Sequence, residues 1–347
     1  MRISRTLPVV LAVVIVAAAV TIAVQLRKHA PPEAARLLPG ADAFFFLDLS
    51  WARKANSGKE LPAVSHDPEY QRFIGETGFE FERDLDEAAF AVHYAANGPG
   101  GPKGAPQPEP RFSEVFIGKF DGGKLTAYLK KHARSVENYQ SIDIYSIPIE
   151  DRTLRVAILG VDAVAASNLD DPVEIHAMVE RSRRLASPFG GPALLRRYYK
   201  RVQLSSPVWL IAHVDPSSRQ FGGAMNFLSH PADLVISASF NPLRLALHPG
   251  AVHVRAEIQT AGDDDARTLA DKVGGFLSLT HAAENSAGAT DADADIKAMF
   301  ESMKVKQDGD RAVLTAAVPL GLLHRALAGS ADATGPGAPA KSAAPPP

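Results

Sequence analysis

Three groups of residues have side chains and spacings that suit chemistry at a binding or catalytic site. The first is a run of alternate aspartates: Asp291, Asp293 and Asp295. This run matches the start of an EF-hand calcium loop, which needs glycine at its sixth position and a bidentate glutamate at its twelfth. Ile296 and Ser302 stand at those positions, so we expect no calcium site. The acids are instead predicted to cap a helix over residues 296–303.

Two further groups could hold a metal or transfer protons. His248 and His253 flank a Pro-Gly turn and would face each other across a hairpin, which makes them a candidate metal pair or, alternatively, surface histidines. Four alternate acids lie beside Arg83: Glu80, Glu82, Asp84 and Asp86. Two of them could serve as acid and base, although this pattern is typical of a solvated edge. We therefore assign no catalytic, cofactor-binding or metal-binding residue.

The sequence lacks the motifs of nucleophilic and phosphate chemistry. It contains no cysteine, no Gly-x-Ser-x-Gly elbow and no glycine-rich loop ending in Gly-Lys-Ser/Thr. The absence of cysteine excludes disulfides, thiolate nucleophiles and iron–sulfur ligation. The formal net charge of −2 argues against a nucleic-acid-binding surface. Acyl transfer through such an elbow and phosphate binding by such a loop therefore lack support.

A charge asymmetry marks a candidate interaction patch. Residues 181–214 contain no acid, whereas the first part of this stretch is rich in basic residues: Arg181, Arg183, Arg184, Arg196, Arg197, Lys200 and Arg201. Three interpretations of this basic segment are open. It is a solvated helix between repeats, it meets the acid-rich residues 60–87, or it contacts anionic lipid headgroups, where each basic residue contributes about 1 kcal/mol.

An unbroken apolar run over residues 6–26 dominates the N-terminus. About 20 residues at a helical rise of about 1.5 Å are enough to cross a hydrocarbon core of about 30 Å. No charge interrupts the run, so its insertion should be favourable. We predict an uncleaved signal anchor, a transmembrane helix over residues 1–28, followed by a tether over 29–36. A cleavable signal peptide is the competing interpretation.

The charges on either side of this run decide its orientation only weakly. Arg2 and Arg5 precede it, and Arg27 and Lys28 follow it, so the positive-inside comparison is nearly balanced. A short N-terminal tail before one apolar run is typical of a signal anchor. The expected location is therefore the inner cell membrane, single-pass, with the C-terminal bulk in the periplasm. A reporter fused after Ala328 would test this orientation.

The sequence after residue 36 predicts an α+β fold with antiparallel strands, built as two degenerate repeats. The first repeat, residues 37–186, should contain strands at 43–49, 88–95, 112–120, 141–147, 154–159 and 163–167. Helices are predicted after Asp67, Asp121 and Pro172, since each residue suits a helix start. The Gly- and Pro-rich residues 97–110 should form a flexible loop.

The second repeat, residues 187–328, follows the same order of elements. Strands are predicted at 208–214, 233–240 and 251–259, a hairpin at 304–318 and a closing helix at 320–328. A helix over 263–279 should bury one apolar stripe: Leu269, Val273, Phe276 and Leu277. Residues 329–347 are predicted to be a disordered tail.

Two segments carry a resemblance to a known family. The stretches LLPGADAFFFLDLS and TGFEFERDLDEAAFAVHYA contain a Leu-Pro-x-Ala-Asp strand start and a Gly-x-x-x-x-x-Asp-Leu segment leading into the next strand. They resemble a bacterial domain-of-unknown-function family of membrane-anchored proteins. The match covers the first third of the chain, and the remainder matches by arrangement only. It implies an extracytoplasmic, duplicated α+β domain and gives no catalytic residue.

These observations predict a membrane-anchored, extracytoplasmic, non-catalytic module that binds a partner in the cell envelope or has a structural role. The expected contacts are the membrane, through the N-terminal helix, a protein partner and anionic lipid. The alternative is a hydrolase-like enzyme whose site is assembled from dispersed His, Asp and Glu residues. A deep cleft lined by such residues from both halves would favour the enzyme. A broad apolar or charged patch would favour binding.

Overall fold

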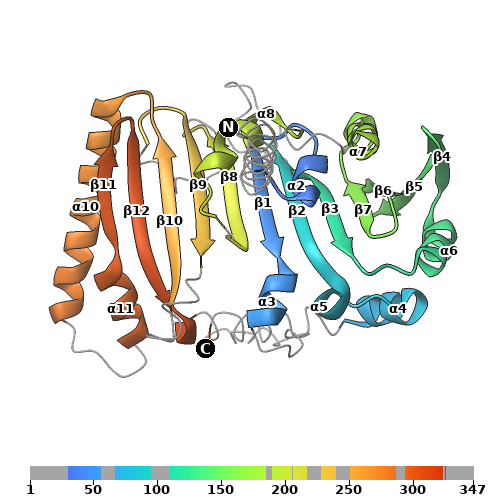
Figure 1. Cartoon of the computed structure of the whole chain (residues 1–347), viewed down its shortest axis with the longest axis horizontal. Coiled ribbons are helices and arrows are strands. Elements are labelled where there is room, and N and C mark those ends of the chain that lie inside the picture. Colours follow the sequence, from blue (N-terminus) through green and yellow to red (C-terminus); the bar gives the residue numbers. More distant parts are fainter. Residues whose placement is uncertain are drawn as a thin grey trace, which may run out of the picture.

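The computed structural model describes residues 30–55, 67–94, 110–184, 190–204, 206–216, 228–239, 251–286, 294–322 and 325. Within these ranges the strands form one twelve-stranded sheet, in the order β11-β12-β10-β9-β8-β1-β2-β3-β7-β6-β5-β4, and neighbouring strands are antiparallel (Figure 1). Helices pack on both faces of the sheet. The predicted α+β class with antiparallel strands is therefore confirmed.

The first half of the chain supplies seven of these strands and most of the short helices. Its elements are α2 (Glu33–Leu37), β1 (Ala43–Asp48), α3 (Leu49–Ala55), α4 (Pro68–Thr77), α5 (Phe81–Asp84), β2 (Leu85–His93), β3 (Arg111–Gly118), α6 (Gly122–His132), β4 (Ser135–Tyr139), β5 (Ile142–Ile149), β6 (Arg152–Ile158), β7 (Ala163–Ser167) and α7 (Val173–Arg183). The second half supplies α8 (Ala193–Tyr198), a 3₁₀ turn η1 (Tyr199–Arg201), β8 (Val208–Val214), β9 (Ala232–Ser239), β10 (Ala251–Gln259), α10 (Asp263–Ser286), α11 (Ala294–Ser302), β11 (Lys304–Asp308) and β12 (Arg311–Pro319).

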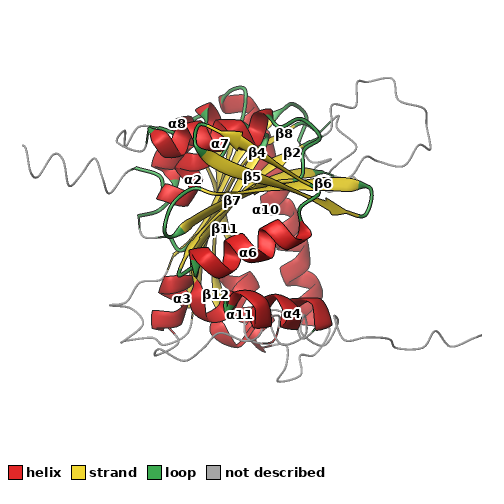
Figure 2. Ribbon diagram, turned by 90° about the vertical axis from the view of Figure 1, so that its right-hand side faces the viewer, coloured by secondary structure: helices red, strands yellow, loops and turns green. Residues whose placement is uncertain are grey.

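The helices divide between the two faces of the sheet (Figure 2). On one face, α2, α7 and α8 cover a core that includes Phe44, Ile175 and Trp209. On the other face, α6 covers one end of the sheet through Leu125 and Leu129, and α10 covers the opposite end. This division follows from strand geometry, because successive side chains of a strand point to opposite faces.

Local capping signals explain several helix boundaries. The Asp67 carboxylate accepts hydrogen bonds from the backbone N–H of Glu69 at 2.9 Å and of Tyr70 at 2.7 Å, and α4 then begins at Pro68. Gly78 ends the helix in the left-handed conformation, with φ of 73°. Asp121 caps α6 through the N–H of Lys124 at 3.0 Å. These starts agree with the sequence-based expectations.

The two predicted repeats meet inside the continuous sheet. β1 pairs with β8, from Ala43 opposite Ala212 to Leu47 opposite Val208. On either side of this pair, β2 and β3 correspond in order to β9 and β10, and each third strand is followed by a helix, α6 or α10. Phe46 stacks on Trp209 across the seam, with ring centroids 5.3 Å apart. The duplication itself stays a prediction, as do its boundaries at 186 and 187.

Several segments differ from the sequence-based expectations. The predicted tether, 29–36, includes most of α2, in which Ala34 and Ala35 have no exposed surface, so this part belongs to the folded domain. Strand β4 and helices α3 and α5 were not predicted, whereas α8 lies in the basic segment for which a helix was one interpretation. Helix α10 extends to Ser286 instead of ending at 279.

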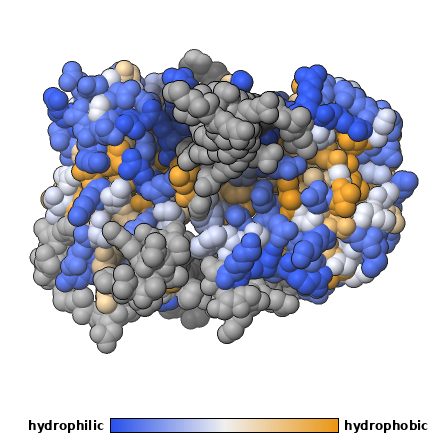
Figure 3. All heavy atoms as spheres, in the orientation of Figure 1, coloured by the Kyte–Doolittle hydropathy of each residue, from blue (hydrophilic) through white to orange (hydrophobic). Residues whose placement is uncertain are grey.

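Other predictions lie on residues that are not described. These are the anchor, most of the Gly- and Pro-rich loop, part of the closing helix and the tail. Within the described ranges, no helix combines the length and the apolar character that crossing a membrane requires. Figure 3 shows hydrophobic residues in clusters on the left and right of the visible face, with hydrophilic residues between them.

Candidate functional site

An apolar groove lies between α10, α11 and the strands at one end of the sheet. It has a volume of about 540 Å³, which falls within the range of about 300–1,000 Å³ typical of ligand pockets. Its lining comes from α10, α11, the residue that follows α11, and three strands: Leu269, Lys272, Val273, Phe276, Leu277, Phe300, Met303, Ala256, Ile258, Val305, Ala312 and Leu314. Among these residues, only Lys272 is charged.

Helix α10 is held against β11 at two described points. At Gly274 a Cβ atom would lie 3.4 Å from Cγ1 of Val305, so helix and strand approach closely there. The N-terminal end is tied to β11 by Gln307, whose side-chain amide donates to the Asp263 carbonyl at 2.9 Å. Phe276 is 66% exposed, contrary to the predicted buried stripe, whereas Leu269 and Leu277 are buried as expected.

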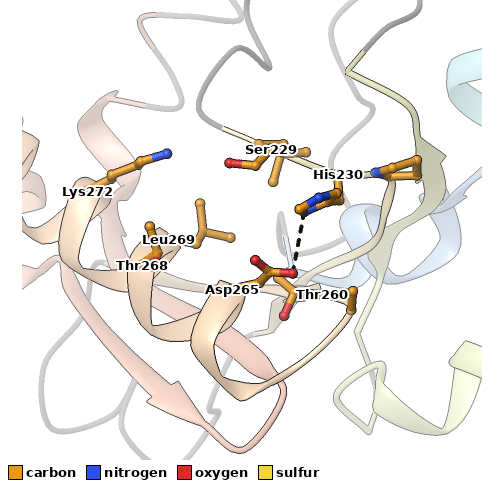
Figure 4. Close-up of a pocket in the computed structure, with 10 residues that line it drawn as sticks. Ser229, His230, Thr260, Asp265, Thr268, Leu269 and Lys272 are labelled. Atoms are coloured by element: carbon orange, nitrogen blue, oxygen red, sulfur yellow. Dashed lines mark ion pairs between the residues drawn. The ribbon is translucent and has the colours of Figure 1, made fainter.

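A small polar hollow adjoins the groove at the N-terminal part of α10 (Figure 4). Its volume is about 30 Å³, and it shares Leu269 and Lys272 with the groove. Its other lining residues come from α10 and from loops: Leu228, Ser229, His230, Pro231, Thr260, Ala261, Asp265 and Thr268. Nδ1 of His230 lies 3.5 Å from the Asp265 carboxylate. Lys272 extends towards Ser229 across the hollow in Figure 4.

The predicted basic segment does not form one uniform surface. On α7, Arg181 is partly buried, which lowers its pKa, and Arg183 donates to the Gln140 carbonyl at 2.7 Å. Arg184 ends the helix and is exposed. On α8, Arg196 and Arg197 are exposed, and Arg197 lies over the ring of Tyr198. The structure therefore divides the segment between two helices.

The last two basic residues of the segment have different surroundings. Lys200 is exposed on η1. Arg201 points to the sheet, where its guanidinium lies 3.5 Å from the buried carboxylate of Glu257. Arg255 at 2.7 Å and Arg311 at 3.1 Å bind the same carboxylate. Arg201 thus has a structural partner, and the lipid-contact interpretation keeps only the exposed members of the segment as candidates.

A tyrosine, an aspartate and a histidine meet where β8 ends and β9 begins. The Tyr198 hydroxyl donates to Asp233, and Nδ1 of His213 lies 2.8 Å from the other oxygen of the same carboxylate. Burial and the bond to Asp233 raise the pKa of Tyr198 to about 12. Aspartate orients histidine in hydrolases, but there the histidine also contacts a nucleophile. Here the hydroxyl is bonded to the aspartate, an arrangement that ties α8 to the sheet.

The acids at 80–86 have structural partners. Asp84 accepts from Arg83 and from the backbone N–H of Glu80, and Arg83 holds its pKa below the ordinary value despite burial. Glu82 accepts from the Tyr70 hydroxyl at 2.7 Å. Asp86 pairs with Arg53. The carboxylates therefore brace α4, α5 and α3, and the acid–base interpretation gains no geometric support.

A neighbouring carboxylate, Glu87, was not singled out from the sequence. It lies opposite Asp48 in the pairing of β1 with β2, and its Oε2 atom is buried without a hydrogen-bond partner. Burial and the charge of Asp48 raise the pKa of Glu87 to about 7. The nearby Tyr199 has its own pKa raised to about 12 by burial and by Glu87. This cluster lies on the α2 and α8 side of the sheet.

Metal binding was considered at two positions in the sequence. His248 and the first two aspartates of the 291–295 run lie outside the described residues, and Asp295 pairs with Arg325 at 2.8 Å. In the part of the chain that the structure describes, no three His, Asp or Glu side chains come together as metal ligands would. The histidine pair at 248 and 253 stays untested.

The chain is similar to solved structures of a protein designated TP0453. Crystal form III aligns with a TM-score of 0.45 and 9% identity over 86% of this chain and 99% of that chain. Form IV gives 0.43 and 10%, covering 86% and 97%, and form I gives 0.41 and 10%, covering 86% and 98%. Similarity at this level assigns neither a function nor a site.

No protein-family model matches the sequence, and no curated protein sequence matches it. The resemblance to a bacterial family of unknown function is therefore not confirmed by these comparisons.

Proposed function

We propose that the protein is a membrane-anchored, non-catalytic binding module that holds an apolar ligand in the groove beneath α10. The observation that carries this proposal is the groove itself: about 540 Å³ with an almost wholly apolar lining. Removal of apolar surface from water is favourable by about 25 cal/mol for each Å², so these walls favour an apolar occupant. A partner in the cell envelope would then deliver or receive that ligand.

Membrane attachment through residues 6–26, with the domain on the periplasmic side, is part of the same proposal. Its support is the apolar run in the sequence, and an apolar ligand would fit a protein held at a bilayer. The family of membrane-anchored proteins that the first third resembles is consistent with this placement. Contact of the exposed arginines of the basic segment with anionic lipid is a further element of the proposal.

Photolabelling of the full chain in lipid nanodiscs tests the groove. An apolar diazirine probe should label peptides from α10 and β12, which line the groove, and also the 6–26 segment if it lies in the bilayer. Ala256→Phe places a large side chain in the groove and should reduce labelling of α10 to background. Ala193→Phe, the same change at an exposed position on α8, should leave it unchanged.

Circular dichroism would first confirm that both variants are folded. Labelling of α10 that is equal in wild type and Ala256→Phe would contradict the proposal. So would labelling confined to the 6–26 segment, since the groove would then be closed to apolar molecules, for example by another segment of this chain.

A further inference from the structure

We propose that the ligand is a hydrocarbon-chain amphiphile with an anionic group, whose chain lies in the apolar groove and whose anionic group lies at Lys272. This inference rests on the proposed function, since it names the ligand class of the same groove. The observation behind it is the position of Lys272, which lines both the apolar groove and the polar hollow.

The two cavities are arranged in order along α10. The hollow is lined from Asp265 to Lys272, and the groove from Leu269 to Leu277. The groove side therefore spans nine residues of helix, and the eight steps between them measure about 12 Å at a rise of about 1.5 Å per residue. An elongated apolar chain matches this shape, with its polar end at the N-terminal part of the helix.

The groove itself favours an anionic group over a cationic one at its end, because Lys272 is the charged residue among those that line it. Asp265, whose carboxylate lies 3.5 Å from Nδ1 of His230, lines the hollow and not the groove. Lys272 supplies the positive charge at the boundary of the two cavities, and the hydroxyl groups of Ser229 and Thr268 line the same hollow (Figure 4). A carboxylate or phosphate accepts hydrogen bonds from ammonium and hydroxyl donors.

The sizes of the two cavities indicate that the polar group of the ligand lies at the hollow and its chain in the groove. The hollow, at about 30 Å³, holds little more than the polar atoms of a small group, whereas the groove, at about 540 Å³, holds a chain. Phe276, which is 66% exposed, borders the groove and leaves an apolar rim on the surface.

Competition against the diazirine probe tests the ligand class, again with the full chain in nanodiscs. Dodecanoic acid, dodecan-1-ol and dodecyltrimethylammonium have the same chain and differ in charge. At pH 8, half-displacement of the probe from α10 should need about three- to tenfold less of the acid than of the alcohol, and most of the cation. Labelling of the 6–26 segment reports any loss of probe from the bilayer itself.

The advantage of the acid should disappear in Lys272→Gln. Lys272 is exposed, so this change leaves the fold intact. Lys297→Gln is the matched control, because Lys297 lies on α11, pairs with Glu301 at 3.9 Å and does not line either cavity. It should retain the wild-type preference.

The outcomes separate the two proposals. If α10 is labelled but the three amphiphiles compete equally, or Lys272→Gln keeps the preference for the acid, the anionic ligand class is wrong and the apolar binding function stands. If α10 is not labelled, both are wrong. Where the wild type prefers the acid, arms with a fatty acid and with a lysophosphatidic acid of equal chain length distinguish a free acid from a lipid headgroup as the source of the anion.

Discussion

Glu87 illustrates how a single residue acts through its surroundings. Its carboxyl group is largely buried beside Asp48, and the backbone N–H of Ala34 is the donor that counteracts this effect. The pKa of about 7 exceeds the ordinary value of 4.5, so the folded chain holds this proton more tightly than the unfolded chain does. Ionisation of Glu87 therefore reduces stability. The cost is absent below about pH 4.5, grows as the pH rises through 7 and is constant above it.

Glu87→Gln should remove this pH dependence. The variant and the wild type should have similar free energies of unfolding at pH 4.5, where the wild-type side chain is protonated. At pH 8 the variant should be the more stable, by at most about 3 kcal/mol, from about 1.4 kcal/mol for each unit of pKa shift. Urea unfolding of both proteins across this range measures the difference. Parallel curves at all pH values would show that Glu87 titrates normally.

Residue types in the sequence indicated some of the candidate site residues but not the side chains that these residues contact. The acids at 80–86 were expected to form a solvated edge, but they brace helices instead: Asp84 is only 9% exposed. Glu87 carries no local signal, because its role depends on contacts with residues far away in the sequence. A lysine inside an otherwise apolar helical stripe was the available hint for the groove.

At the scale of elements, the bounds of several strands and helices were predictable, because turn and capping residues next to them in the sequence set those bounds. The observed bounds of β7, β8 and β10 match the predicted ranges, and α4 begins and ends at its expected caps. Helix α2 was missed because its five residues follow Pro32 directly and are too few to show a helical period, although each favours a helix; burial of Ala34 and Ala35 holds it in place. The groove beneath α10 was missed because an apolar stripe at helical spacing does not show how closely the helix approaches the sheet.

Gly118 and Gly275 show that the surroundings of a glycine decide whether substitution by alanine lowers or raises the free energy of unfolding. At Gly118, near the end of β3, a Cβ atom would lie 2.5 Å from the Asp84 carbonyl oxygen. Gly118→Ala should lower the free energy of unfolding by about 1–3 kcal/mol, since backbone must move. Gly275 in α10 has open space around it, and Gly275→Ala should raise stability by about 1 kcal/mol.

Denaturant unfolding measures both effects as shifts of the midpoint at constant slope. Changes of the same sign in the two variants would contradict the packing described for Gly118 and for α10. A Gly275→Ala variant that is stabilised also provides a protein in which the groove can be tested with a more rigid helix.

The whole molecule is organised around the pairing of β1 with β8. One sheet passes through the predicted boundary between repeats, so the two halves share hydrogen bonds and a core rather than touching as separate domains. The order of elements in the two halves was predictable because each half has its own strand and turn signals. The joining of both into one sheet was not, since strand pairing over this distance in sequence leaves no local pattern.

Trp209 should therefore hold both halves together. It is 1% exposed, stacks on Phe46 across the seam and contacts Tyr199 with ring centroids 5.4 Å apart. Trp209→Ala should lower the free energy of unfolding by about 3–5 kcal/mol, because it removes a large buried side chain and leaves a cavity. Leu279→Ala, at a position that is 72% exposed, is the control and should change it by less than about 0.5 kcal/mol.

Cooperativity distinguishes a shared sheet from two independent domains. Urea unfolding of the wild type should give coincident transitions by tryptophan fluorescence and by far-UV circular dichroism, since neither half keeps its core when the seam opens. In Trp209→Ala, the remaining tryptophan, Trp51 in the first half, should still report the same transition as circular dichroism, shifted to lower urea. A biphasic curve with one half persisting would mean that β1 and β8 join two units that fold separately.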